Sequence, residues 1–232
     1  MCNLYSITAA REAMLRMFRV GHNRAAAFAP MQAIFPGHVA PVLRLADDGE
    51  RELTSMSWGF VLLQDGRAPK RVTNTRDDKI QSRFWRPSFE RRRCLVPASS
   101  FCEPHDGRKP ATWHWFALTG EDPRPLFAFA GIWLRWRGPV KKDGPAVDLD
   151  VYSFMTTEPN AATQSINHER SPVLLTKPDE FDAWLGTDVA VAQALVRPIA
   201  GDRLRIVQEG FEKMDLLGIV AAPAFSAQPK LL

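Results

Sequence analysis

Apolar or alternating runs of strand length, bounded by Pro and Gly, recur along the chain and predict a strand-rich protein. Pro36-Gly37 divides the segment 33–45, and Trp58-Gly59 ends the segment 52–60. Pro97 and Pro104 each end an apolar run within 93–104. A hairpin or loop at 141–148 is expected to join the last two. Strands are therefore expected within residues 33–45, 52–60, 93–104, 126–136 and 150–157.

Two segments carry the signals of helices. Residues 8–19 begin at Thr8, a good N-cap residue, and residues 177–186 have Pro178 early, acids in the first turn and Gly186 at the end. The apolar face expected for the first helix consists of Ala10, Met14, Met17 and Phe18.

These elements, with a polar loop predicted at 60–73, indicate an α+β fold. A chain of 232 residues with 45% hydrophobic content can bury one substantial core, and no long linker or internal repeat divides it. We therefore expect a single domain over 1–222, built on a central barrel-like and mostly antiparallel β-sheet flanked by a few helices. A loose C-terminal tail is expected at 223–232.

Composition narrows the class of protein. No apolar run approaches the roughly 18 residues of a membrane helix, and the N-terminus lacks the regions of a signal peptide, so a cytoplasmic protein without membrane contact is predicted. A monomer is expected. Cys2, Cys94 and Cys102 show no CxxC or His/Cys ligand spacing, which argues against a disulfide framework and a metal site. No cofactor is expected.

The net charge of +4 is unevenly distributed. Residues 70–142 contain 16 basic and 7 acidic residues, a balance of +9, whereas the rest of the chain has a balance of −5. Within this region, 83–93 interleaves five arginines with Phe84, Trp85 and Phe89, a combination typical of single-stranded nucleic-acid binding. An amphipathic helix is the favoured alternative for these aromatic side chains, but it leaves the regional charge unexplained.

Cys2 is the first candidate for chemistry. A residue this small usually permits removal of the initiator Met, which leaves one residue with both a free α-amino group and a thiol. The amine has a reference pKa of about 7.7–8.0 and the thiol of about 8.5. An aldehyde can form a Schiff base with such an amine and then close onto sulfur. On the first six residues alone, a buried Cys that merely begins a strand is the favoured interpretation.

Asn74, Glu103 and His168 are the other polar residues placed where a strand or loop is expected to expose them. Glu103 ends an apolar run, where desolvation raises a carboxyl pKa and permits proton shuttling, although a strand-end ion pair is the simpler interpretation. His168 suits acid/base work near neutral pH, yet a structural His is commoner. Asn74 can bond a substrate hydroxyl or the terminal amine, or only build a turn. Standard catalytic motifs are absent.

Taken together, the segments that hold these residues resemble the SRAP family, the SOS-response-associated peptidases also described as abasic-site processing proteins. The resemblance covers most of the chain and follows the family's order. It rests on Met1-Cys2, FPGHVAPVLR, Trp58-Gly59, NTR at 74–76, RRCLVPASSFCE ending at Glu103, FAGIW at 129–133, MTT at 155–157 and HERSPVLL at 168–175.

The resemblance implies a central barrel-like sheet, a basic groove for single-stranded DNA, and a mature N-terminal Cys that forms a thiazolidine DNA–protein crosslink with abasic sites. On that basis Cys2 supplies amine and sulfur, and Asn74 positions the sugar or the terminus. Glu103 assists proton transfers, and His168 acts as acid/base on the opening sugar. Met1 must leave first, through an aminopeptidase or by self-cleavage. The implied DNA-binding residues are Trp58, Arg76, Arg83 and Arg170.

The sequence departs from the family pattern at several positions that bear on DNA binding. Asn3-Leu4 stand where Gly-Arg is common, and Pro104 stands where an aromatic residue follows the Glu. Ser171 replaces a larger residue, and Asp77-Asp78 follow Arg76 where Glu-Thr is usual. These departures predict a weaker or altered DNA preference.

Two other functions remain open from the sequence. An N-terminal-nucleophile cysteine amidohydrolase or peptidase would use Cys2 to form a thioester, with its own amine as base, and needs no basic groove. A non-catalytic single-stranded DNA-binding protein would bind in a salt-sensitive way, indifferent to abasic sites and to Cys2. The local charge balance of +9 favours a DNA-binding function over the amidohydrolase. The presence of Cys2, Asn74, Glu103 and His168 together favours a catalytic protein over a simple DNA-binding protein.

Overall fold

Five strands of the computed structural model, which describes residues 2–105, 107 and 109–217, close into a barrel. Their order is β13–β12–β9–β4–β5, and β5 pairs back onto β13. Neighbouring strands are antiparallel except at that closure, where Val151 and Tyr152 pair in parallel with Ser57 and Trp58. The strands are β4 (Val39–Leu45), β5 (Arg51–Trp58), β9 (Arg93–Ala98), β12 (Phe127–Pro139) and β13 (Ala146–Thr157).

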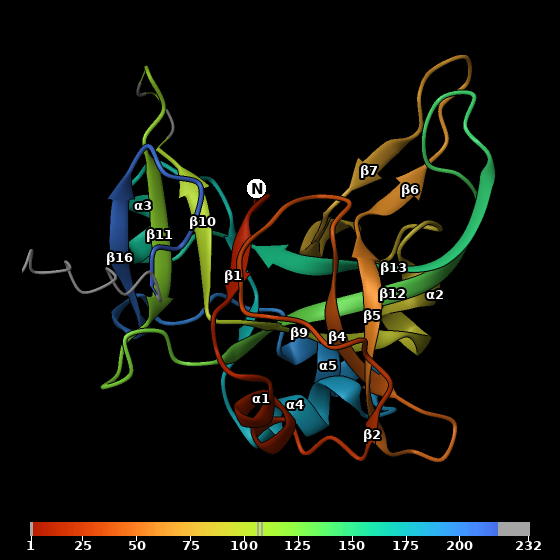
Figure 1. The fold of residues 1–232 in the computed structure, drawn as a ribbon, viewed down its shortest axis with the longest axis horizontal. Helices are drawn as coiled ribbons and strands as arrows, with labels where there is room; N and C mark the ends of the chain where they lie inside the picture. The colour runs from red at the N-terminus through yellow and green to blue at the C-terminus, as the bar shows by residue number, and fades with distance from the viewer. Residues whose placement is uncertain (1, 106, 108, 218–232) are drawn as a thin grey trace, which may run out of the picture.

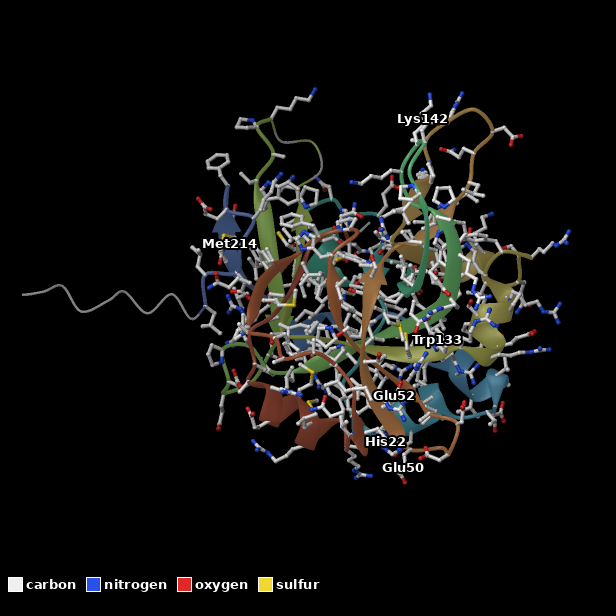
Figure 2. All side chains as sticks on the ribbon, turned by 45° about the vertical axis from the view of Figure 1, so that its right-hand side comes forward. His22, Glu50, Glu52, Trp133, Lys142 and Met214 are labelled. Atoms are coloured by element: carbon white, nitrogen blue, oxygen red, sulfur yellow. The ribbon has the colours of Figure 1, made fainter. Side chains whose placement is uncertain are left out.

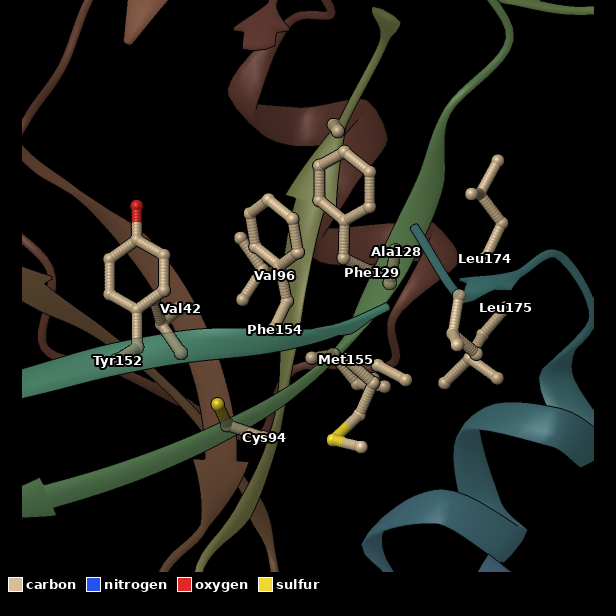
Figure 3. Close-up of a cluster of buried hydrophobic side chains, with 14 of the residues drawn as sticks. Val42, Cys94, Val96, Ala128, Phe129, Tyr152, Phe154, Met155, Leu174 and Leu175 are labelled. Carbon is tan, nitrogen blue, oxygen red and sulfur yellow. The ribbon is translucent and has the colours of Figure 1, made fainter. Parts of the chain in front are cut away.

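Aromatic rings make up much of the buried core, and Figure 3 shows Phe129, Tyr152 and Phe154 side by side within it. The Phe154 ring stacks on Phe129 with centroids 4.3 Å apart and on Trp58 with centroids 5.3 Å apart. The hydroxyls of Tyr5 and Tyr152 share a hydrogen bond, so the one polar end of each ring is satisfied inside the core.

A second, antiparallel sheet of five strands lies beside the barrel (Figure 1). In this sheet β1 pairs with β10, and one face carries a smaller core cluster of Leu4, Cys102 and Trp115. The start of the chain is thereby fixed next to the end of β10. In sheet order the strands are β16 (Leu204–Gly210), β11 (Trp113–Leu118), β10 (Ser100–Pro104), β1 (Tyr5–Ile7) and β3 (Met31–Ile34).

Helices α2 and α4 pack against barrel strands from outside, α1, α4 and α5 lie together at the lower end in Figure 1, and α3 lies beside β16 of the second sheet. Trp184 of α4 donates its indole N–H to the carbonyls of Cys94 and Gly131, each 3.0 Å away. A Cβ at Gly131 would lie 2.7 Å from the Cys94 sulfur, so only glycine fits this crossing. The helices are α1 (Arg11–Met17), α2 (Arg86–Arg91), α3 (Ala161–Gln164), α4 (Pro178–Leu185) and α5 (Val189–Ala194).

Short elements complete the described fold. Of these, β8 runs parallel to the end of β13, which places Asn74 opposite Phe154. No helix among the described residues is long and apolar enough to cross a membrane. The short elements are β2 (His22–Asn23), β6 (Phe60–Leu62), β7 (Lys70–Val72), β8 (Asn74–Arg76), β14 (Ser171–Pro172), β15 (Leu174–Leu175) and the 3₁₀ helices η1 (Asp77–Lys79) and η2 (Gly201–Arg203).

The expected single α+β domain with a barrel-like, mostly antiparallel sheet is confirmed. All five strand segments contain strands, and α4 spans the helix expected at 177–186. The hairpin or loop expected at 141–148 is the turn between β12 and β13. The tail expected at 223–232 lies outside the described residues.

Two local predictions need correction. The first helix begins at Arg11 with Ala10 as its N-cap, because the backbone N–H of Thr8 donates to the Ser99 hydroxyl and holds that residue in the sheet connection. Residues 60–73 are not only a loop. The β6–β7 hairpin occupies both ends of that segment, and Phe60 at its start is fully buried.

The amphipathic helix expected as the alternative for the aromatic residues of 83–93 is found in part. Trp85 and Phe89 are buried at the start and within α2, whereas Phe84 keeps 37% of its surface exposed. Burial of the first two removes them as stacking platforms for bases, and it leaves Phe84 as the aromatic side chain of this segment that meets solvent.

Candidate active site around Cys2

Cys2 precedes β1 and is 1% exposed. Its carbonyl oxygen accepts a 2.7 Å hydrogen bond from the side-chain amide of Asn74, and its thiol donates to the Leu4 carbonyl at 3.4 Å. Leu4 is itself held by packing in the smaller core cluster and by the backbone N–H of Cys102, which donates to its carbonyl at 2.9 Å. Cys2 therefore lies on a segment that is held by Asn74 at Cys2 itself and by the core cluster and Cys102 at Leu4.

Thr73 links the two residues that flank Cys2 in space. Its hydroxyl donates to Oδ1 of Asn3 at 2.9 Å and lies 2.8 Å from the Asn74 side-chain nitrogen, which donates to it. Asn3, one of the departures from the family pattern, is thus an anchor for the N-terminal segment. The neighbouring departure, Leu4, supplies packing to the same segment.

Glu103 and His168 form a buried pair beside this segment. Glu103 is the next-to-last residue of β10 and is 0% exposed, and Nε2 of His168 lies 3.1 Å from its Oε2. His168 follows α3, and its backbone N–H donates to the Thr163 carbonyl at 3.1 Å. Asn167, just before it, takes the left-handed conformation with φ of 58°, which turns the chain so that the imidazole faces β10.

Burial is the main cause that raises the pKa of the Cys2 thiol, and the nearby charge of Glu103 raises it further. The thiol is therefore protonated at neutral pH in this structure. Glu103 follows Cys102, whose backbone N–H bonds to the carbonyl of Leu4, two residues after Cys2, so the carboxylate belongs to the strand that holds the N-terminal segment. Through these contacts the structure brings together all four residues predicted to carry chemistry: Cys2, Asn74, Glu103 and His168.

The residues predicted to bind DNA are dispersed, and their environments differ. Trp58 is 0% exposed and donates its indole N–H to the Thr73 carbonyl at 3.1 Å, so it supports the site from within the core. Arg83 is exposed, and its side chain makes no ion pair with the residues that the structure describes.

Arg76 and Arg170 are both engaged by the two aspartates that follow Arg76. Arg76 donates to both oxygens of Asp78, at 2.9 and 2.8 Å. Arg170 donates to Asp77 and, at 2.7 Å, to the Thr156 carbonyl. Each aspartate carboxylate thus binds a guanidinium group that was predicted to bind a DNA phosphate.

The interpretation of the sequence missed Thr73 and His114. Nothing in the VTNTR segment distinguishes Thr73, because its role depends on contacts with the distant Asn3. His114 had a weak signal, since it is a titratable residue inside an apolar strand-like run, and the structure buries it at 2% exposure on β11.

The described residues contain no group of three or more His, Cys, Asp and Glu side chains placed to hold a metal ion. Cys2, Cys94 and Cys102 are free thiols, and all three are buried.

Comparison of the sequence with known protein families shows to which family the chain belongs. The family described as SOS response associated peptidase (SRAP) matches residues 1–209. The chain belongs to the SRAP family. No curated protein matches the chain. Family membership makes this SRAP protein an SOS-response-associated, peptidase-like protein.

Solved structures share the fold of this SRAP protein. A protein from Bordetella bronchiseptica is 22% identical with a TM-score of 0.68, over 90% of this chain and 98% of that one. A protein from Bacteroides thetaiotaomicron is 18% identical with a TM-score of 0.69, over 88% and 90% of the two chains. A phage-related protein from Bordetella bronchiseptica is 18% identical with a TM-score of 0.64, over 88% and 92%.

Proposed function

We propose that this SRAP protein, once Met1 is removed, forms a thiazolidine crosslink between Cys2 and the aldehyde of an abasic site in single-stranded DNA. The observation that carries the proposal is the convergence of Asn74 and the buried Glu103–His168 pair on the residue that would bear both the amine and the thiol. Each group has a place in the chemistry of an aldehyde with an aminothiol.

The proposed reaction begins with the amine. The nitrogen of Cys2 adds to the aldehyde carbon of the ring-opened sugar to give a carbinolamine, which loses its hydroxyl as water after taking a proton. The Cys2 sulfur then bonds to the resulting imine carbon, and the thiol proton is released. One proton is taken up and one is given back, and the net product besides the crosslink is one water.

Glu103 and His168 suit the two proton transfers. The imidazole is 3.1 Å from the carboxyl group, and Glu103 follows Cys102, whose backbone N–H bonds to the Leu4 carbonyl beside Cys2. A protonated member of the pair would supply the proton for the leaving hydroxyl, and the same pair would then accept the thiol proton. Asn74, by holding the Cys2 carbonyl, fixes where the amine lies.

The raised pKa of the Cys2 thiol supports an amine-first reaction over the thioester route of a cysteine amidohydrolase. Thioester formation needs a thiolate as nucleophile, and burial disfavours that charge. In the crosslinking reaction the sulfur is needed only after the imine has formed, when its electrophilic carbon is already adjacent.

Intact-protein mass spectrometry tests the proposed function directly. Protein lacking Met1 is mixed with a single-stranded oligonucleotide that contains one abasic site, and the expected mass is that of protein plus oligonucleotide minus one water. The undamaged oligonucleotide is expected to give no adduct. Amide hydrolysis without DNA and without an adduct would support the amidohydrolase instead, and reversible binding without an adduct would support a simple DNA-binding protein.

Loss of either member of the buried pair is expected to slow the reaction without unfolding the protein. Glu103→Gln keeps the shape but cannot carry the proton, and His168→Ala removes the imidazole. We expect each to lower the single-turnover crosslinking rate by about 10²-fold or more, the usual contribution of general acid–base catalysis.

The matched control for that experiment is Glu158→Gln, which makes the same change at an exposed position. Its rate should equal that of the wild type. Wild-type rates in both Glu103→Gln and His168→Ala would remove the catalytic assignment of the pair.

The ion pair between Arg76 and Asp78 is expected to limit DNA affinity. Phosphate must displace the carboxylate, so Asp78→Asn should tighten binding of an undamaged oligonucleotide by about two- to five-fold at low salt, the scale of an exposed ion pair. The slope of log affinity against log salt should steepen by about 0.7, as expected for one more phosphate contact on a single strand.

Asp48→Asn is the control for charge alone, because it removes one negative charge next to His22 of β2, at the end of the molecule far from β1 (Figures 1 and 2). Fluorescence anisotropy titrations at several salt concentrations measure both quantities. An unchanged salt slope in Asp78→Asn would show that Arg76 does not contact phosphate.

A further inference from the structure

A row of titratable residues crosses three neighbouring strands of the five-stranded sheet. In the strand register Glu103 of β10 lies directly opposite His114 of β11, and His114 lies directly opposite Glu209 of β16. Directly opposite residues of antiparallel strands place their side chains on the same face, with Cβ atoms roughly 4.5–5.5 Å apart. The three side chains therefore form one continuous row.

The row leads from the buried site to solvent. Glu103 is 0% exposed and His114 is 2% exposed, whereas the Glu209 side chain is 52% exposed. Nε2 of His114 lies 3.2 Å from Oε1 of Glu209, and at the other end Oε2 of Glu103 lies 3.1 Å from Nε2 of His168.

The middle of the row has two buried polar atoms without a hydrogen-bond partner, one on each of two directly opposite residues. Among the described residues, Oε1 of Glu103 and Nδ1 of His114 are both buried and have no hydrogen-bond partner. Buried polar atoms in folded proteins are nearly always hydrogen-bonded. Because these two belong to directly opposite residues, one bond between them, or one bridging water, would satisfy both.

We infer that His114 is a proton-relay residue that connects Glu103 to solvent through Glu209. This inference rests on the proposed crosslinking function. When Glu103 gives its proton to the leaving hydroxyl of the carbinolamine, His114 returns one to it from Nδ1 and is recharged at Nε2 from the Glu209 side. When the thiol later releases its proton, Glu103 passes its own proton to Nδ1 of His114 and accepts the thiol proton, while His114 releases one proton from Nε2 toward Glu209, so the site ends in its starting state.

The relay explains how a fully buried acid can exchange protons with water. Imidazole can accept a proton on one nitrogen while it releases a proton from the other, which the carboxamide of a glutamine in its place cannot do at neutral pH. His105 is another titratable group close to His114, with ring centroids 5.8 Å apart. Lys213 lies over the Trp113 ring on the neighbouring position of β11.

The test is the pH dependence of single-turnover crosslinking to an abasic oligonucleotide. His114→Gln retains hydrogen bonding without proton transfer, and Glu209→Gln interrupts the exposed end of the row. We expect both to lower the rate by about tenfold, less than direct loss of a general acid. The deficit should grow as pH rises, because protons then become scarce at the buried end, and added imidazole buffer should restore part of the rate.

Binding of the undamaged oligonucleotide should be unchanged in both variants, and His22→Gln, at a remote exposed histidine, should behave as wild type. A wild-type protein that forms no crosslink would refute the proposed function itself. A crosslinking wild type with unchanged pH profiles in His114→Gln and Glu209→Gln would overturn the relay alone. Glu209 is exposed, so its variant reports on the relay even where a change at His114 reduces folding.

Discussion

Replacing Cys2 by Ala or Ser is expected to abolish the denaturation-resistant adduct with an abasic oligonucleotide. Both variants lose the sulfur, and without it the imine formed by the amine cannot close into the thiazolidine ring. The imine is hydrolysed when the protein is denatured, so no shifted band should remain on a denaturing gel. The expected change is complete loss.

Borohydride makes this experiment sharper, because it reduces an imine to a stable amine. Cys2→Ser and Cys2→Ala with Met1 removed should give a band only when the reductant is present during incubation, and the wild type should give one without it. Protein that retains Met1 should give neither, since its Cys2 nitrogen is an amide.

Cys102→Ala is the matched control for the loss of a buried thiol, because Cys102 is also 1% exposed and lies in the same sheet. It should keep the adduct. A resistant band of wild-type intensity from Cys2→Ala without reductant would show that another residue forms the bond.

Asp215→Asn is expected to cause the largest loss of stability among single polar substitutions. Asp215 is 0% exposed and accepts hydrogen bonds from Nε and Nη2 of Arg124, at 2.8 and 2.9 Å, and from the hydroxyls of Ser6 and Ser100. It thereby ties residue 215 to β1 and β10. Breaking a buried ion pair from one side typically costs about 3–5 kcal/mol, because the remaining charge is buried without its partner.

Urea unfolding followed by tryptophan fluorescence measures this loss. Asp202→Asn, at an exposed position, should leave the midpoint unchanged. Joint replacement of Arg124 by Met and Asp215 by Leu should recover most of the stability, since well-packed apolar residues often replace a buried ion pair at little cost. A wild-type midpoint in Asp215→Asn would contradict the assignment.

The same residue predicts a loss of stability in acid. Burial by itself would raise the pKa of Asp215, but the hydrogen bonds from Arg124 and Ser100 outweigh it and lower the pKa. A carboxyl group with a lowered folded-state pKa contributes fully above its unfolded pKa of about 3.9, and the contribution is lost as pH falls through the folded value. Asp215→Asn should therefore remove part of the acid dependence.

Local signals predicted the elements that form from neighbouring residues. Pro178 marks the start of α4 because its fixed φ suits the first helical turn, and Gly186 marks the end, where an added Cβ would lie only 3.1 Å from the Asp182 carbonyl of the last turn. Thr8 failed as an N-cap for the opposite reason. Its backbone N–H is used by Ser99, which is distant in sequence, and a tertiary hydrogen bond decided where the helix begins.

The sequence alone determined the chemical inventory of this protein: a Cys next to the initiator Met, the polar residues Asn74, Glu103 and His168, an excess of basic residues in its middle third, and the family to which it belongs. The tertiary structure decided which of them meet. Cys2 contacts Asn74, and Glu103 contacts His168, only because β1 pairs with β10 and β8 pairs with β13. Strand pairing between distant segments follows from burial and backbone hydrogen bonding over the whole domain, and no local spacing encodes it. The same packing placed Asp77 against Arg170 and aligned His114 between the site and solvent, whereas the ion pair of Arg76 with Asp78 is a local contact between residues two apart in sequence.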